Sequence, residues 1–133
     1  MKRAIQVFSV VGVFFFLNCT SNSPMKLVYS DQNNNVYVVT HDALTYEPIA
    51  ERESSSGVYS GGEAFKVTLE PSEYEEIMNL AREIANDPGG KSNTRKMLTS
   101  VLTLVDDRKE SAFILGKSEM RTKLESLLQK HKK

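Results

Sequence analysis

Few residues in this chain are of the kinds that perform acid–base or nucleophilic chemistry. The sequence contains two histidines, His41 and His131, and one cysteine, Cys19. A nucleophilic triad would need one of the histidines as its base. We expect His131, the third residue from the end, to lie in a frayed segment, and His41 to have a structural or surface role at a strand end. The sequence therefore predicts a protein that is not an enzyme.

Acidic residues occur in two groups, and each has a structural explanation. Asp106 and Asp107 stand between two predicted strands, where adjacent aspartates are ordinary turn residues. Three glutamates fall in the first turn of a predicted helix, where they suit the positive end of the helix dipole; they are Glu73, Glu75 and Glu76. The chain has no HExxH motif, no CxxC pair and no glycine-rich phosphate loop. We expect no catalytic residue, no metal site and no cofactor.

Cys19 carries the clearest chemical signal. A basic start, Lys2-Arg3, precedes an uncharged stretch from Ala4 to Leu17, and polar residues follow the cysteine at once. This is the pattern of a signal peptide, because the apolar stretch is shorter than the roughly 20 residues of a membrane-spanning helix. A cysteine at the end of such a stretch resembles the lipobox of bacterial lipoproteins. The resemblance implies cleavage before Cys19 and lipid, such as palmitate, on its sulfur.

The details of the processing site leave alternatives open. Asn18 stands where most lipoboxes have Gly, Ala or Ser, whereas the run Phe14-Phe15-Phe16 resembles the looser sites of spirochaetal lipoproteins. Ordinary secretion with a free cysteine, or an uncleaved anchor, are the alternatives. Thr20 replaces the aspartate that retains enteric lipoproteins at the inner membrane, so the resemblance favours the outer membrane of the cell envelope.

The sequence divides into three parts. Residues 1–18 form the predicted lipoprotein signal peptide, residues 19–25 the lipidated cysteine and a short tether, and residues 26–133 a single domain. Removing the signal peptide leaves 15 basic and 17 acidic residues, a net charge of −2. This charge does not suggest a nucleic-acid partner. With its one cysteine acylated, the domain would have no disulfide and would depend on packing.

The pattern of apolar residues predicts strands, a helix, a hairpin and a second helix. The region from Pro71 carries Ser72 and Glu75 at the spacing of a capping box and an apolar stripe at helical spacing up to Ala85. Ser118 is the expected cap of the last helix. The predicted strands, from period-two alternation and β-branched residues, cover residues 25–30, 36–41, 43–49, 63–69, 96–105 and 111–115. We therefore predict an α+β domain, a small antiparallel sheet covered by two amphipathic helices.

The segment Tyr59-Ser60-Gly61-Gly62 is the candidate partner-binding site. A tyrosine beside a Gly-Gly turn can present its ring and open backbone N–H groups to a protein, as recognition loops do. The alternative is a tight bend with Tyr59 packed inward. We leave both open.

The order of elements after this segment resembles that of emfourin-like small bacterial proteins. The resemblance spans residues 56–128 and rests on Ser60-Gly61-Gly62, although Glu63 stands where that family usually has an aromatic residue and Phe65 follows two positions later. It implies a non-catalytic protein-binding module, an inhibitor of thermolysin-like metallopeptidases. The expected partners are a membrane, through lipid on Cys19, and an envelope protein or peptidase. The alternative is a structural or surface-exposed lipoprotein without a dedicated ligand. The sequence does not predict the oligomeric state.

Overall fold

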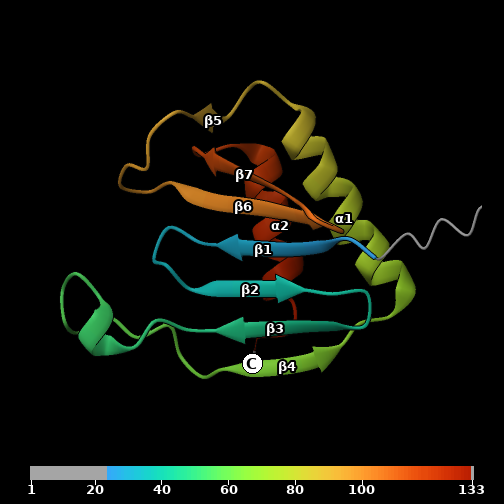
Figure 1. Ribbon diagram of the computed structural model, residues 1–133. Coiled ribbons are helices and arrows are strands. Elements are labelled where there is room, and N and C mark those ends of the chain that lie inside the picture. Colours follow the sequence, from blue (N-terminus) through green and yellow to red (C-terminus); the bar gives the residue numbers. More distant parts are fainter. Residues whose placement is uncertain (1–23, 133) are drawn as a thin grey trace, which may run out of the picture.

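A seven-stranded antiparallel sheet forms the body of the molecule. The computed structural model describes residues 24–132, so the predicted signal peptide and Cys19 lie outside the described residues. The strand order is β4-β3-β2-β1-β6-β7-β5, as Figure 1 shows. The strands are β1 (Lys26–Ser30), β2 (Val36–Val39), β3 (Ala43–Glu47), β4 (Phe65–Thr68), β5 (Lys91–Ser92), β6 (Ser100–Asp106) and β7 (Lys109–Leu115).

The predicted α+β class is confirmed, but the sheet is larger than the small one expected. Strands β1 to β4 follow one another through antiparallel pairs, and β6 and β7 form the predicted hairpin around Asp107 and Arg108. β3 ends at Glu47, directly before Pro48, because a proline cannot donate a hydrogen bond to the ladder. β5 was not predicted, because two residues after Gly89-Gly90 are too few to show an alternating pattern.

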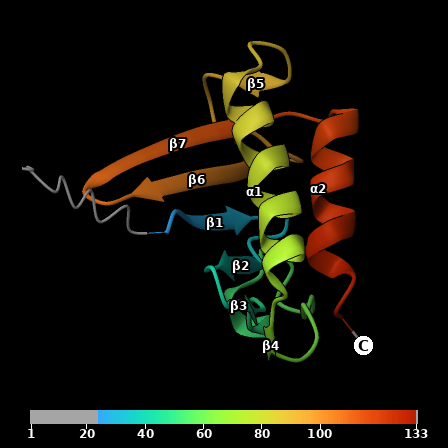
Figure 2. The same cartoon turned by 90° about the vertical axis from the view of Figure 1, so that its right-hand side faces the viewer.

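Two helices lie on the same face of the sheet and run across its strands (Figure 2). They are α1 (Pro71–Asn86) and α2 (Glu119–Gln129), and they contact each other. A short 3₁₀ turn, η1 (Glu51–Glu53), lies in the loop between β3 and β4. Ser118 caps α2 as predicted, its Oγ accepting a hydrogen bond from the Arg121 N–H at 3.1 Å.

The start of α1 differs from the predicted cap. Glu70 is the N-cap, and its N–H donates to Glu73 Oε2 at 3.1 Å, so Ser72 and Glu75 do not form the capping box. The reason is Pro71, which occupies the first helical position. There its fixed φ suits the helix and its missing N–H costs nothing, so the cap is the residue before it.

The core lies between the sheet and the helices. Its centre is a row of rings across four strands, with centroids 6.4 Å apart for Tyr29 and Tyr37, 4.7 Å for Tyr37 and Tyr46, and 5.2 Å for Tyr46 and Phe65. The three tyrosines are at most 1% exposed. Such ring pairs contribute about 0.5–1.5 kcal/mol each beyond the area that they bury. The aromatic row therefore fixes strands β1 to β4 relative to one another.

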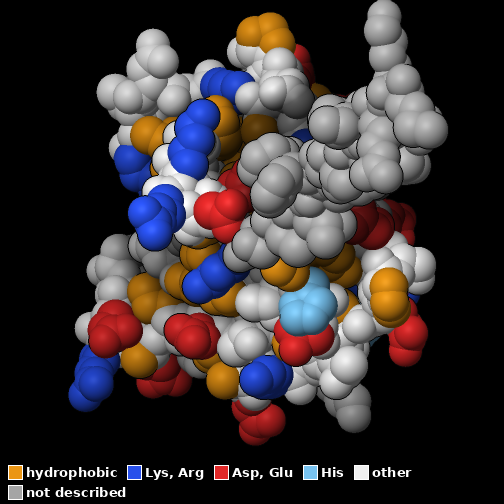
Figure 3. All heavy atoms as spheres, turned by 45° about the vertical axis from the view of Figure 1, so that its right-hand side comes forward, with side chains coloured by type: hydrophobic (Ala, Val, Ile, Leu, Met, Phe, Trp, Pro, Cys, Tyr) orange, Lys and Arg blue, Asp and Glu red, His pale blue; other side chains and the backbone are white. Residues whose placement is uncertain are grey.

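The opposite face of the sheet has no helix over it in the described residues (Figure 2). It carries the alternate, half-buried positions of the strands, among them Val28, Val38 and Val101. Figure 3 shows basic and acidic side chains interleaved with hydrophobic ones on the side that it presents. No helix in the described part of the chain is long and apolar enough to cross a bilayer.

Candidate protein-binding surface

The antiparallel register separates the two ends of the sheet. The end where β1 begins, near the β2–β3 and β6–β7 turns, is where the chain enters the domain, because Lys26 pairs with Val105 and Leu27 with Val39. The other end, where β1 finishes and β6 begins, gathers three loops. We call these loops, residues 31–35, 48–64 and 93–99, the loop end of the sheet. The strands put about 15–20 Å between the two ends, at ~3.3 Å per residue.

The loop of residues 93–99 presents two apolar side chains to solvent. Met97 is 92% exposed and Leu98 is 64% exposed. Leu98 also has a φ of +66°, in the left-handed region that costs a residue with a Cβ about 1–2 kcal/mol. The prediction that residues 96–99 belong to a strand was therefore wrong. Leu98 is in phase with the alternating Leu102 and Leu104, which is why the sequence predicted a strand there, but the ladder begins only at Ser100.

Arg95 fixes this loop from one side. Its Nη1 donates to the Thr99 carbonyl, and its Nη2 donates to Asn34 Oδ1 at 2.7 Å and to the Asp31 carbonyl at 3.3 Å. Within the loop, Thr99 Oγ1 donates to the Lys96 carbonyl at 2.6 Å. Hydrogen bonds at both ends of the Lys96–Thr99 turn hold the backbone that carries the two apolar side chains.

Arg121, on α2, fixes the loop from beneath. It is 4% exposed, and its Nη1 donates to the Leu98 carbonyl at 2.7 Å, while its Nε donates to Glu125 Oε1 at 3.0 Å. The same carboxylate oxygen accepts the Tyr29 hydroxyl at 2.5 Å. Burial raises the pKa of Tyr29 above its usual range, and the bond to Glu125 raises it further. The strained Leu98 is therefore held by a partly buried ion pair that is hydrogen-bonded to Tyr29 of the aromatic core.

A groove adjoins the exposed loop. It has a volume of about 420 Å³ and is lined by Gln32, Met97, Leu98, Thr99, Gly116, Lys117, Arg121, Thr122 and Glu125. Its volume lies within the roughly 300–1,000 Å³ of ligand-binding clefts. Its lining combines the exposed apolar Met97 and Leu98 with polar and charged side chains, as in a protein-interaction surface where an apolar anchor stands among polar groups.

The segment Tyr59–Gly62 lies at the same end of the sheet, largely tied into the fold. Tyr59 is half-buried, and its hydroxyl accepts from Asn35 Nδ2 at 3.0 Å. Gly61 is buried, and its carbonyl accepts from the Tyr46 hydroxyl at 2.7 Å and from Lys132 Nζ at 2.9 Å. A Cβ on Gly61 would collide with Asn35 Oδ1. These contacts favour the tight bend, while Ser60 and Gly62 remain exposed.

The two outer loops meet at the polar turn between β1 and β2. Asp31 is 8% exposed and Asn35 is 2% exposed. Asp31 Oδ1 accepts from the N–H groups of Asn33 and Asn35, while Asn35 Oδ1 accepts from the Ile49 N–H at 3.1 Å. Since Arg95 binds the Asp31 carbonyl and Tyr59 binds Asn35, this turn joins the loops of residues 48–64 and 93–99.

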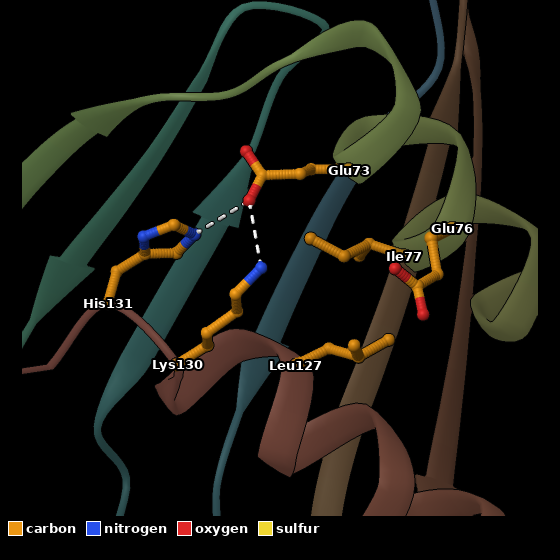
Figure 4. Close-up of a pocket in the computed structure, with 6 residues that line it drawn as sticks. All are labelled: Glu73, Glu76, Ile77, Leu127, Lys130 and His131. Carbon is orange, nitrogen blue, oxygen red and sulfur yellow. Dashed lines mark hydrogen bonds and ion pairs between the residues drawn. The ribbon is translucent and has the colours of Figure 1, made fainter.

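His41 lies at the opposite end of the sheet from this surface, whereas His131 lies beside Gly62 and Glu63 of the loop of residues 48–64. His41 is exposed in the β2–β3 turn, 3.7 Å from Asp42. We expected His131 to lie in a frayed segment, but its ring packs against the start of α1. Its Nε2 lies 3.6 Å from Glu73 Oε1, the oxygen that Lys130 also contacts (Figure 4). A hydrogen bond from the Glu70 N–H and the Lys130 contact lower the pKa of Glu73. These residues join the start of α1 to the end of α2 around a cavity of about 10 Å³, the size of one water.

The described residues thus form an α+β domain with helices on one face and a fixed loop cluster at one end of the sheet. Among them, no group of three His, Cys, Asp or Glu side chains is placed to hold a metal ion. No protein-family model, curated protein or solved structure matches the chain.

Proposed function

We propose that this protein is a membrane-anchored bacterial envelope lipoprotein whose domain binds another envelope protein without catalysing a reaction. The observation that carries the binding role is the loop of residues 93–99. Met97 and Leu98 are exposed apolar side chains on a backbone that two arginines hold in a strained conformation. Exposed apolar side chains mark interaction sites when they gather at one place, and retained strain points to a functional constraint.

The proposed anchor gives this surface a direction. Lipid on Cys19 would hold the domain through the residues up to Pro24, a tether of at most ~20 Å. The chain enters β1 at the end of the sheet opposite the loop end. A domain anchored in this way presents its loop end away from the membrane. The partner would therefore be reached in the space beyond the lipid headgroups, and a thermolysin-like peptidase is the candidate that the emfourin resemblance supplies.

The test combines the anchor with the loop. In the native cell, Cys19→Ala should abolish palmitate labelling and move the protein to the soluble fraction. A photocrosslinking amino acid in place of Met97 should give one dominant protein adduct. The same amino acid in place of Arg108, an exposed residue at the other end of the sheet, is the matched control and should not give it.

Leu98→Asn provides the second arm of the test. Asparagine tolerates the left-handed conformation, so the domain should stay folded while the adduct formed from position 97 is lost. Equal adducts from positions 97 and 108, or none from either, would contradict the binding role and favour a lipoprotein without a dedicated ligand. Retained palmitate labelling of Cys19→Ala would contradict the anchor.

A further inference from the structure

The free edge of β4 carries a second surface. It lies at one end of the strand order, whereas β5, which the loop of residues 93–99 follows, lies at the other end. β4 is the last strand at its edge of the described sheet (Figure 1). A groove of about 500 Å³ runs along this edge and reaches the end of α2; its lining is Gly62, Glu63, Ala64, Phe65, Lys66, Val67, His131 and Lys132. The groove therefore follows a backbone edge.

The register shows which backbone groups this edge presents. The Leu69 N–H donates to the Asp42 carbonyl at 2.9 Å, and the strands pair antiparallel. Antiparallel ladders alternate, so Phe65 and Val67 also direct their N–H and C=O groups toward β3. Lys66 and Thr68 direct theirs away from the sheet. An extended chain laid along the edge would meet these two residues.

The side chains of β4 define what pattern the added chain must have. Phe65 and Val67 are half-buried on the helix-covered face, where Phe65 stacks on Tyr46. Lys66 and Thr68 lie on the opposite face and are exposed. Residues of an added strand alternate in the same way. Its apolar side chains would pack beside Phe65 and Val67, and a side chain facing Lys66 would be acidic, because opposite charges on neighbouring strands attract.

The charge of the groove supports the same choice of partner. Lys66 is the basic lining residue on the face where the acidic side chains would lie. Lys132 lies on the helix-covered face, its Nζ 4.8 Å from the centre of the Tyr46 ring and bonded to the Gly61 carbonyl. Glu63 is the acidic residue among the lining side chains. Lys66 also disfavours self-pairing, because edge-strand lysines oppose the approach of a second identical edge.

We propose that the β4 edge binds an extended segment of a protein partner by strand addition, and that this segment alternates acidic and apolar residues. Backbone hydrogen bonds to Lys66 and Thr68 supply the docking, and the alternate side chains supply the selectivity. This site is separate from the loop of residues 93–99, so the proposal for either site can be refuted without affecting the proposal for the other.

The experiment uses the full chain in detergent and a capped hexapeptide of alternating glutamate and valine. Amide exchange measured by nuclear magnetic resonance should slow at Lys66 and Thr68 when the peptide binds, and stay unchanged at Phe65 and Val67. Fluorescence polarisation with the labelled peptide gives the affinity. The same peptide with N-methylated amides, and a lysine–valine peptide, should both bind more weakly.

Lys66→Glu should weaken binding of the glutamate–valine peptide by about fivefold, since an exposed ion pair contributes up to ~1 kcal/mol and the new glutamate repels the peptide. Lys109→Glu, the same change at an exposed position on β7, is the control and should leave the affinity unchanged. The proposal is overturned by unchanged exchange at Lys66 and Thr68, by equal binding of the methylated or lysine-containing peptide, or by equal effects of the two variants. Protection of the same amides by self-association without peptide would also overturn it.

Discussion

Arg121 is the residue whose replacement most directly tests how the exposed loop is supported. Arg121→Met keeps the helix propensity and most of the buried stem but removes the guanidinium. The Glu125 carboxylate, with a side chain 24% exposed, then loses its ion-pair partner, and the Leu98 carbonyl loses its donor. Removing one partner of a buried pair costs 3–5 kcal/mol, and the partial exposure of Glu125 places this case near the lower end, at about 3 kcal/mol.

A second substitution separates the lost charge partner from the lost packing. In Arg121→Met/Glu125→Gln, no unpaired charge remains, and the glutamine Oε can still accept the Tyr29 hydroxyl. We expect the double variant to regain about 1–2 kcal/mol relative to the single one. For a domain of this size, the single variant should lower the Tm by about 12 °C, at ~4 °C per kcal/mol.

The assay is urea denaturation followed by far-UV circular dichroism and tyrosine fluorescence, because the chain has no tryptophan. Amide exchange should also quicken at Thr99, whose N–H donates to the Lys96 carbonyl within the loop. A loss below about 1 kcal/mol in the single variant would refute the reasoning. So would a double variant as unstable as the sum of its parts, or exchange at Thr99 that does not change.

Two further predictions concern the core and the bend at Gly61. Gly61→Ala should cost about 1–3 kcal/mol in urea denaturation because the new methyl group meets Asn35, Pro48 and Tyr46, whereas Gly116→Ala, whose methyl group meets nothing closer than 3.5 Å, should be close to neutral; equal costs would contradict this account. Burial is the first cause that raises the pKa of the four core tyrosines, so the native state keeps protons that the unfolded state loses above its pKa of ~10. Stability should therefore be level below that pH and fall above it by about 1.4 kcal/mol per pH unit for each tyrosine that stays protonated. Phenolate absorbance of these four residues, Tyr29, Tyr37, Tyr46 and Tyr74, should then rise together with unfolding in a spectrophotometric titration. A rise in still-native protein larger than the fifth tyrosine, Tyr59, alone can give would contradict this prediction.

Elements whose cause is local were predictable from the sequence. The β6–β7 hairpin follows from two alternating stretches around a polar turn. Helix α2 begins directly after Ser118 because a serine at the cap position can accept a backbone N–H. Leu102 and Leu104 alternate in the sequence within the predicted strand, and both lie in the core. In each case the residues that determine the structure lie within a few positions of it.

The candidate surface was not predictable in the same way, because its contacts span the chain. Arg95 binds a carbonyl 64 residues earlier, and Arg121 binds one 23 residues earlier. Without those partners, Met97 and Leu98 match the pattern of the following strand. One signal was present in the sequence: Arg121 falls on the same face of the last helix as Leu124 and Leu128, with Glu125 four positions on. A charged pair on an apolar stripe indicates a buried ion pair.

The turn of residues 31–35 gives a physical reason why both outer loops can act as one surface. Its Asp31 and Asn35 are buried, and between them they bind groups of both loops. The buried Asn35 side chain accepts from the Ile49 N–H and donates to the Tyr59 hydroxyl of one loop, whereas Arg95 of the other loop donates to the Asp31 carbonyl. Because burying a polar side chain is costly unless it is hydrogen-bonded, displacing the first loop would leave Asn35 partly unpaired. Loops fixed before binding lose little conformational entropy when a partner docks. Movement of either loop would break bonds to this turn, and the position of Met97 is therefore coupled to that of Tyr59.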